Sequence, residues 1–315
     1  MKRFAVFLCA EDSEYVKKKH GGYFEVFLGM LAEEGETWDG YRVANGEFPG
    51  EDEIDLYDGF VVTGSCNDAH GNDVWVLRLL ALLKTLHSKK KKILGVCFGH
   101  QILSRALGGK TGRATTGWDI GMRTISVYPT ELLSGFEIPS QLSVIEFHRD
   151  EVKELPPYVD VIARSEKTGI EMFMCGDHAM GIQGHPEYDE GILVSLIDRL
   201  QARYAIEDSL ADAAKASFQK GQPDKETWKK LCRGFLKGTL LVFEILQKGT
   251  EIGTSFFYID NSTPVMNVSE RSSVFRNNQN FHSFSHEASI PYQKWDMRRE
   301  GEGEKTLMVV GLEKA

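Results

Sequence analysis

Residues 93–101 have the sequence ILGVCFGHQ, and the interpretation of the rest of the chain depends on them. An apolar run ends in Gly-x-Cys-x-Gly, and helix-forming residues follow at once. This order of strand, tight turn and helix is typical of a nucleophile elbow, which carries its reactive side chain on the turn. The flanking glycines leave room for a strained backbone because they have no Cβ. The stretch therefore places Cys97 at a helix N-terminus, where the helix dipole favours a thiolate.

A packed turn is the alternative interpretation of this stretch. Cysteine is among the most buried residue types, and a short motif of this kind also occurs by chance. The catalytic interpretation therefore depends on finding a base elsewhere in the chain.

The first hundred residues alternate between short apolar runs and amphipathic helical patterns. Apolar runs bounded by turn residues are typical of strands buried on both faces of a parallel sheet. We therefore predict an α/β fold with a mainly parallel central sheet flanked by helices. The expected strands are residues 4–9, 38–43, 59–63 and 93–96, and the expected helices are residues 23–34 and 74–86. Ligands bind at the carboxyl ends of such strands, so Gly64, Ser65 and Cys97 should meet at one edge.

The pattern changes after Gly108-Gly109, where short β-branched runs separated by turn residues predict an antiparallel extension of the sheet. These runs are residues 122–127, 143–147, 159–163, 170–174 and 179–183, and a helix is expected at 189–204. We expect residues 1–241 to form the catalytic domain. Residues 242–315 have weak hydrophobic periodicity and many Asn, Ser and charged residues, so we expect a weakly ordered extension there.

Charge and cysteine content limit the classes of function. The chain has 315 residues and a formal net charge of -9, which argues against a nucleic-acid or anionic-membrane binder. The lysine run at 89–92 is better explained as a solvated helix end than as a binding patch. No apolar run approaches the roughly 18–20 residues of a transmembrane helix. The five cysteines are widely spaced and indicate neither a disulfide framework nor a zinc site, so we expect a reducing compartment, the cytosol.

A candidate base follows the apolar run that ends near residue 183. Gly184 is followed by His185, Pro186 and Glu187, and a proline disfavours a helical conformation for the residue before it. In an extended chain, residues two apart point the same way, so Glu187 can accept the ring N–H of His185. The other ring nitrogen can then face Cys97, as a catalytic triad requires. The alternative is that these residues form a simple turn.

The motifs GVCFGHQ at 95–101 and GHPE at 184–187 together resemble those of the class I glutamine amidotransferases, over roughly residues 2–204. The resemblance implies a flavodoxin-like fold, a triad of Cys97, His185 and Glu187, and an oxyanion hole made by the backbone N–H groups of Gly64 and Phe98. The loop at 63–68, TGSCND, departs from the Gly-Gly-Pro that is usual in the family.

The same resemblance implies substrate-binding residues. The glutamine of the elbow motif helps to hold the γ-glutamyl group in the family, and the segment FHRD at 147–150 is similar to one whose backbone binds the α-amino and α-carboxylate groups. The candidates are Gln101, Ser65, His148, Arg149 and Asp150. The resemblance implies no metal and no organic cofactor.

Several segments are similar to plant γ-glutamyl peptidases, which remove the γ-glutamyl residue from glutathione conjugates. They are VVTGS at 61–65, DAH at 68–70, FHRDEV at 147–152 and GHPEY at 184–188. This similarity implies a small γ-glutamyl substrate (glutathione or its S-conjugates), a glutamyl-thioester intermediate, and no required partner protein, nucleic acid or membrane. Two other hypotheses remain open: a glutaminase subunit that delivers ammonia to a separate synthetase, and a non-catalytic binding module. The segment from 242 does not resemble that family's usual ending.

Overall fold

A computed structural model describes residues 1–130, 133, 138–238, 257–258 and 266–267. The chain divides into two units, Met1–Leu240 and Leu241–Ala315. In the second unit the described residues form β12 (Phe257–Tyr258) and β13 (Met266–Asn267), which pair antiparallel. The rest of the expected extension at 242–315 lies outside the described residues.

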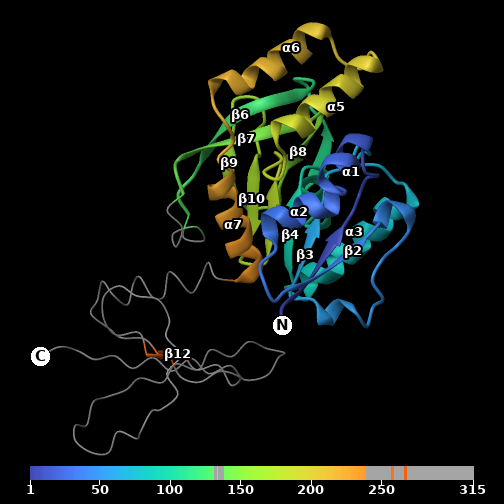
Figure 1. Cartoon of the computed structure of the whole chain (residues 1–315). Coiled ribbons are helices and arrows are strands. Elements are labelled where there is room, and N and C mark those ends of the chain that lie inside the picture. Colours follow the sequence, from blue (N-terminus) through green and yellow to red (C-terminus); the bar gives the residue numbers. More distant parts are fainter. Residues whose placement is uncertain (131–132, 134–137, 239–256, 259–265, 268–315) are drawn as a thin grey trace, which may run out of the picture. The chain divides into compact units, whose positions relative to one another are not determined.

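Among the described residues, a nine-stranded sheet forms the centre of the first unit (Figure 1). The strand order is β2-β1-β3-β4-β11-β10-β9-β6-β7. Neighbours from β2 to β11 are parallel, and the later neighbours are antiparallel. The predicted mainly parallel sheet with an antiparallel extension is confirmed. The strands are β1 (Arg3–Phe7), β2 (Thr37–Tyr41), β3 (Gly59–Val62), β4 (Lys92–Val96), β6 (Asp119–Val127), β7 (Gln141–His148), β9 (Asp160–Arg164), β10 (Met172–Cys175) and β11 (Ala179–Ile182).

One strand was assigned to the wrong part of the sheet. We predicted residues 179–183 within the antiparallel extension, but β11 pairs parallel with β4, with Val96 opposite Ile182. The reason is the tight hairpin between β10 and β11, which reverses the chain and returns it to the parallel edge. A separate two-stranded sheet of β5 (Lys110–Arg113) and β8 (Asp150–Glu154) was not predicted.

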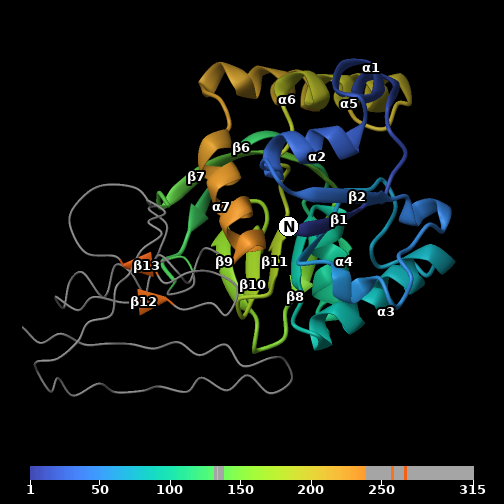
Figure 2. The same ribbon diagram turned by 60° about the horizontal axis from the view of Figure 1, so that its bottom comes forward.

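Helices cover both faces of the sheet (Figures 1 and 2). Alternate side chains of β1 explain this, because Phe4 and Val6 pack in one apolar cluster while Ala5 and Phe7 pack in another. The first cluster includes α2 (Tyr23–Leu31) and α7 (Lys225–Lys237), and the second includes α3 (Val74–Ser88) and α4 (Phe98–Ala106). Strands buried on both faces have continuous apolar sequences, which is why they could be predicted.

A third apolar cluster joins helices to β6 and β7. Ile120 and Ile145 of these strands pack with Leu193 and Ile197 of α5. The helices of this cluster are α1 (Glu14–His20), α5 (Glu190–Ala202) and α6 (Asp208–Ala216). Elsewhere and beside it, short 3-10 helices span Val43–Asn45, Ile54–Leu56 and Ser217–Lys220. No helix in the described part of the chain has the length and apolar character needed to cross a bilayer.

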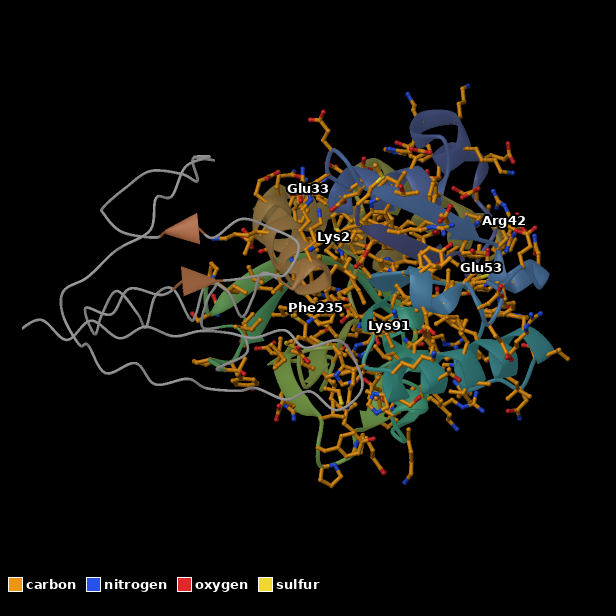
Figure 3. The ribbon with its side chains drawn as sticks, turned by 90° about the horizontal axis from the view of Figure 1, so that it is seen from below. Lys2, Glu33, Arg42, Glu53, Lys91 and Phe235 are labelled. Carbon is orange, nitrogen blue, oxygen red and sulfur yellow. The ribbon has the colours of Figure 1, made fainter. Side chains whose placement is uncertain are left out.

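Polar contacts fix α7 to the segment after α2. Arg233 donates from Nε to the carbonyl oxygen of Met30 at 2.8 Å, and Lys237 Nζ lies 2.8 Å from Glu36 Oε1. Figure 3 shows this side of the molecule, with Glu33 and Phe235 labelled. α7 also packs against β3 and β4 of the sheet.

Candidate active site

Cys97 lies on a strained turn between β4 and α4. Its φ is +53°, a value that residues with a Cβ rarely adopt. A Cβ on Gly99 would lie only 2.1 Å from the carbonyl oxygen of Val62, and one on Gly95 would lie 2.4 Å from the carbonyl oxygen of Gly99. Both glycines are required because the start of α4 lies directly against the strands.

Strand pairing brings His185 to the same edge as Cys97. Val96 is opposite Ile182, and the backbone N–H of Cys97 donates to the carbonyl oxygen of Ile182 at 2.8 Å. His185 follows three residues later, and its N–H donates to the carbonyl oxygen of Ile145 in β7 at 2.7 Å. The two residues therefore lie at the carboxyl ends of adjacent parallel strands, where ligands bind in α/β sheets.

Glu187 orients the imidazole of His185. Its Oε1 lies 2.8 Å from His185 Nδ1, and because a carboxylate only accepts, Nδ1–H is the donor. The other ring nitrogen, Nε2, is left to face Cys97, whose charge acts on His185. The contact with Glu187 is made through a turn at 186–187, in which the N–H of Tyr188 donates to the carbonyl oxygen of His185 at 3.3 Å. We expected the contact to form across an extended segment, with a simple turn as the alternative. The structure has the turn and also the contact that the triad requires.

The charges of this cluster favour an imidazolium. Burial lowers the pKa of His185, but the charges of Glu187 and Cys97, with the hydrogen bond to Glu187, outweigh it and raise the pKa to about 10. Cys97 is 5% exposed and His185 is 2% exposed, so little solvent screens this interaction. The arrangement can therefore hold a thiolate and an imidazolium side by side, which is the state that nucleophilic attack by cysteine needs.

The loop after β3 borders the nucleophile. A Cβ on Gly64 would lie 2.8 Å from His185 Cε1 and 3.7 Å from Cys97 Cβ, so only glycine fits here. Phe98 is the first residue of α4, where backbone N–H groups have no partner within the helix. Ser65 is half-buried, and its Oγ accepts from Asn67 N at 3.1 Å, which shapes the loop. The structure thus places Gly64 and Phe98 next to Cys97, and Ser65 follows Gly64 in the loop.

Three of the predicted substrate-binding residues form a buried polar framework. Gln101 donates from Nε2 to the carbonyl oxygen of Asp150 at 2.9 Å and to Gln183 Oε1 at 3.1 Å. His148 Nδ1 lies 2.9 Å from the same Asp150 carbonyl oxygen, to which it donates. Arg149 is exposed, and its carbonyl oxygen accepts from the N–H of Ala114. The framework ties α4 to β8 and to the end of β11.

Sequence reasoning gave no functional role to Tyr188. Its ring stacks on that of His185, with centroids 4.0 Å apart and planes 8° apart. It also packs against the ring of Tyr23, with centroids 6.2 Å apart. Its position directly after Glu187 was the only signal in the sequence.

A buried acidic layer next to this framework was also missed. Burial and the charge of Asp119 raise the pKa of Glu146 to about 8, and burial raises that of Glu171 as well. Glu146 Oε2 lies 3.3 Å from His148 Nε2. His148 donates from Nδ1, so Nε2 of its neutral ring is an acceptor. Neither this atom nor Glu146 Oε2 has a hydrogen-bond partner among the described residues, and protonation of Glu146 places a donor beside the ring. The sequence signal was an acid at an inward position of an alternating apolar strand, after Leu142 and Val144.

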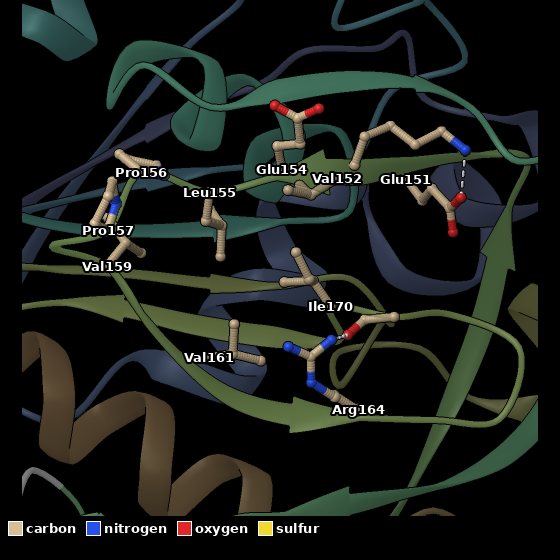
Figure 4. A pocket seen from close by; sticks show the side chains of 12 residues that line it. Glu151, Val152, Glu154, Leu155, Pro156, Pro157, Val159, Val161, Arg164 and Ile170 are labelled. Atoms are coloured by element: carbon tan, nitrogen blue, oxygen red, sulfur yellow. Dashed lines mark hydrogen bonds and ion pairs between the residues drawn. The ribbon is translucent and has the colours of Figure 1, made fainter.

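A groove of about 420 Å³ lies along β8 and β9 (Figure 4). Val152, Val161 and Ile170 line it, together with the polar side chains of Glu151 and Arg164. It contains no residue of the Cys97, His185 and Glu187 group. The chemistry described above therefore belongs to the sheet edge and not to this groove.

Comparison with known proteins agrees with this geometry. The family model "Glutamine amidotransferase class-I" matches residues 42–193. Gamma-glutamyl peptidase 5 of Arabidopsis thaliana is 48% identical over 241 residues, covering 75% of this chain and 96% of that protein. Gamma-glutamyl peptidase 2 of the same plant is 44% identical over 240 residues, covering 76% of this chain and 97% of that protein. A crystal structure of a Thermotoga maritima glutamine amidotransferase shares the fold, with a TM-score of 0.56 and 20% identity over 76% of this chain and 98% of that one. The chain therefore belongs to the class I glutamine amidotransferases and, among them, to the gamma-glutamyl peptidase family of hydrolases.

Proposed function

We propose that the protein is a cysteine-dependent γ-glutamyl peptidase that hydrolyses the γ-glutamyl amide of glutathione or its S-conjugates. The observation that carries the proposal is the position of His185, hydrogen-bonded to Glu187 and held at the same sheet edge as Cys97 on its strained turn. The 48% identity to a protein named as a gamma-glutamyl peptidase supports the choice of substrate class.

The first half-reaction is acyl transfer to the thiol. The Cys97 thiolate attacks the γ-carbonyl carbon, and a C–S bond forms. The oxyanion accepts hydrogen bonds from the backbone N–H groups of Phe98 and Gly64; loss of one such donor typically costs about 10²–10³ in rate. The C–N bond then breaks, and His185 gives its Nε2 proton to the leaving amine, a cysteinylglycine moiety when glutathione is the substrate.

The second half-reaction is hydrolysis of the glutamyl thioester. Neutral His185 takes a proton from water as the water oxygen attacks the same carbonyl carbon. The C–S bond breaks, glutamate leaves, and the thiolate and imidazolium are restored. Glu187 keeps the imidazole in the tautomer that both steps need and stabilises its charged form.

Substrate recognition is assigned to the surroundings of the thiol. In this proposal Gln101, Ser65 and the segment 148–150 border the pocket for the glutamyl group. The hydrogen bonds of Gln101 and His148 to the Asp150 carbonyl oxygen, and the position of Ser65 directly after Gly64, support it. Residues 1–241 are the catalytic domain, an assignment supported by relatives that align over 240 and 241 residues. The proposal needs no partner protein, and a glutathione substrate is compatible with a cytosolic location.

Mass-spectrometric detection of released glutamate tests the proposal. The purified protein is offered glutathione, an aromatic S-conjugate of glutathione, and glutamine, each in a separate reaction. We expect glutamate and a cysteinylglycine product from the first two, no product with Cys97→Ala, and full activity with Cys66→Ala, which changes an exposed cysteine. Turnover of glutamine alone would contradict the peptidase assignment and favour a glutaminase subunit. Absence of any turnover dependent on Cys97 would contradict both.

A further inference from the structure

His87, Cys175 and His178 form a cluster at the end of the sheet opposite to Cys97. His87 lies in the last turn of α3, Cys175 ends β10, and His178 immediately precedes β11. β11 is parallel to β4, and His178 and Lys92 stand at the start of these strands, whereas Cys97 follows the end of β4. The cluster is therefore separate from the catalytic chemistry proposed above.

We propose that His87, Cys175 and His178 bind a Zn²⁺ ion, with a solvent molecule in the fourth position. One potential ligand atom from each residue lies within 4.8 Å of those of the other two. Two imidazoles and one thiolate are a donor set that Zn²⁺ prefers, and three protein ligands with an open fourth position are a common zinc arrangement.

The distances are close to those of a bound site. His87 Nδ1 and His178 Nε2 are 2.9 Å apart. Two nitrogens at zinc-ligand distance in a tetrahedron are about 3.3 Å apart, so the imidazoles need to separate by only a few tenths of an ångström. The rings lie at 25° to each other with centroids 5.0 Å apart, and the two nitrogens share a hydrogen bond, so a zinc ion would take the place of the proton between them.

The backbone holds two of the ligands in place. Cys175 and His178 flank the turn between β10 and β11, in which Gly176 has φ +54°. A Cβ on Gly176 would lie 3.4 Å from His178 Nδ1, so the glycine keeps the ring free of crowding. Asp177 Oδ1 lies 4.0 Å from His178 Nδ1, on the side of the ring away from His87, where a carboxylate often supports a zinc-bound histidine.

Burial and charge around the cluster suit one bound ion. Cys175 and His178 are each 4% exposed, while His87 is half-buried and open to solvent, which gives the ion a route of entry. The positive charge of Lys90 is felt by His87, Cys175 and His178, and that of Lys92 by His178. The negative charge of Asp160 is felt by Cys175, and that of Asp177 by His178. The two lysines oppose a cation, but Lys90 favours the Cys175 thiolate, and the two aspartates balance the lysines.

Sequence spacing did not indicate this site because His87 lies far from the Cys175–His178 pair along the chain. The three side chains meet because β11 pairs with β4. His178 directly precedes β11, and α3, which carries His87, directly precedes β4.

Zinc titration of the full chain after dialysis against a chelator tests the proposal. All measurements use the Cys97→Ala background, so that metal bound by the catalytic thiol does not contribute. We expect one Zn²⁺ per chain, and a loss of affinity of roughly 10- to 100-fold or more in Cys175→Ser and in His87→Asn. Cys66→Ser and His20→Asn are matched controls and should retain the affinity. No zinc binding in the background protein, or equal affinity in Cys175→Ser and Cys66→Ser, overturns the proposal.

A second readout uses the unsubstituted cysteine and does not depend on the variants folding. Zn²⁺ should slow alkylation of Cys175, measured on its peptide by mass spectrometry, while Cys66 is unaffected. Equal alkylation of Cys175 with and without Zn²⁺ also overturns the proposal.

A third readout is spectroscopic. Co²⁺ in place of Zn²⁺ should show a thiolate charge-transfer band that Cys175→Ser removes, and a band that survives in this variant counts against the proposal.

Discussion

The ring of Tyr188 lies flat against the imidazole of His185, with centroids 4.0 Å apart and an interplanar angle of 8°. Tyr188 follows Glu187 directly, so the residue that orients the imidazole through a hydrogen bond is followed by one that orients it by stacking. Two contacts in different planes leave the ring little freedom to rotate, which is what a base that must serve both half-reactions requires.

The stacking predicts different effects for two substitutions. Tyr188→Ala removes the ring, so His185 can rotate, and we expect kcat/KM for the γ-glutamyl substrate to fall roughly 10- to 100-fold. Tyr188→Phe keeps the ring and removes only the hydroxyl group, so its kcat/KM should stay near that of the wild type. Steady-state kinetics on all three proteins provide the check. Equal losses in the two variants would show that the hydroxyl, and not the stacking, is important.

Glu187 should control the protonation of His185. In Glu187→Gln the charge that most raises the pKa of His185 is gone, so that pKa should fall from about 10. We expect kcat/KM to fall by about 10²–10⁴, because the imidazolium and its tautomer are no longer stabilised. A pH titration of the His185 ring by NMR gives the pKa directly, and Glu190→Gln, at an exposed helix position, serves as the control. An unchanged His185 pKa in Glu187→Gln would contradict the assigned charge interaction.

The same interaction predicts how stability changes with pH. The folded-state pKa of His185 is above its ordinary value of 6.5, so the folded state binds this proton more tightly than the unfolded state. Its contribution to the free energy of unfolding is therefore full below pH 6.5 and is lost as the pH rises toward about 10. Denaturant unfolding at the two ends of this range should show a smaller loss in Glu187→Gln than in the wild type. An equal loss in both proteins would assign the dependence to other groups.

Glu146 should make the folded state less stable at alkaline pH. Its pKa is raised from 4.5 to about 8, so the folded state holds a proton that the unfolded state releases in this range. Stability from this group is therefore lost as the pH rises from 4.5 to about 8. Glu146→Gln keeps a donor for His148 without a titrating proton, so above pH 8 the variant should unfold with a free energy higher than the wild type by roughly 1–3 kcal/mol. Thermal and denaturant unfolding on both sides of this window measure the difference, and a variant less stable at every pH would contradict the neutral-acid assignment.

Gly99 should tolerate no side chain. A Cβ there would lie 2.1 Å from the carbonyl oxygen of Val62, so Gly99→Ala must push α4 away from β3. We expect a loss of roughly 1–3 kcal/mol in the free energy of unfolding, with a loss of activity as Cys97 moves. Gly29→Ala in α2 is the matched control, since its Cβ would meet nothing within 4 Å. Alanine there should stabilise the helix by roughly 0.5–1 kcal/mol, and chemical denaturation of both variants compares them.

Local patterns in the sequence determined the elements and the nucleophile. Buried parallel strands have continuous apolar sequences, which marked the strands at 59–63 and 93–96 and the sheet that contains them. The glycines on either side of Cys97 marked the elbow, because a turn so close to two strands leaves no room for a Cβ. The pairing of Glu187 with His185 could also be predicted, because both residues lie within one short segment, but it was expected across an extended chain and not through the turn that the structure shows.

Only the tertiary structure decided which distant elements meet. The parallel pairing of β11 with β4, the stack of Tyr188 on His185, and the packing of Glu146 against His148 were not predictable from local spacing. A local pattern fixes whether a residue points into a core, but its neighbours there depend on strand order and direction, which the packing of the whole domain selects. For this reason the sequence identified Cys97 and His185, whereas their buried supports and the separate histidine–cysteine cluster appeared only in the folded chain.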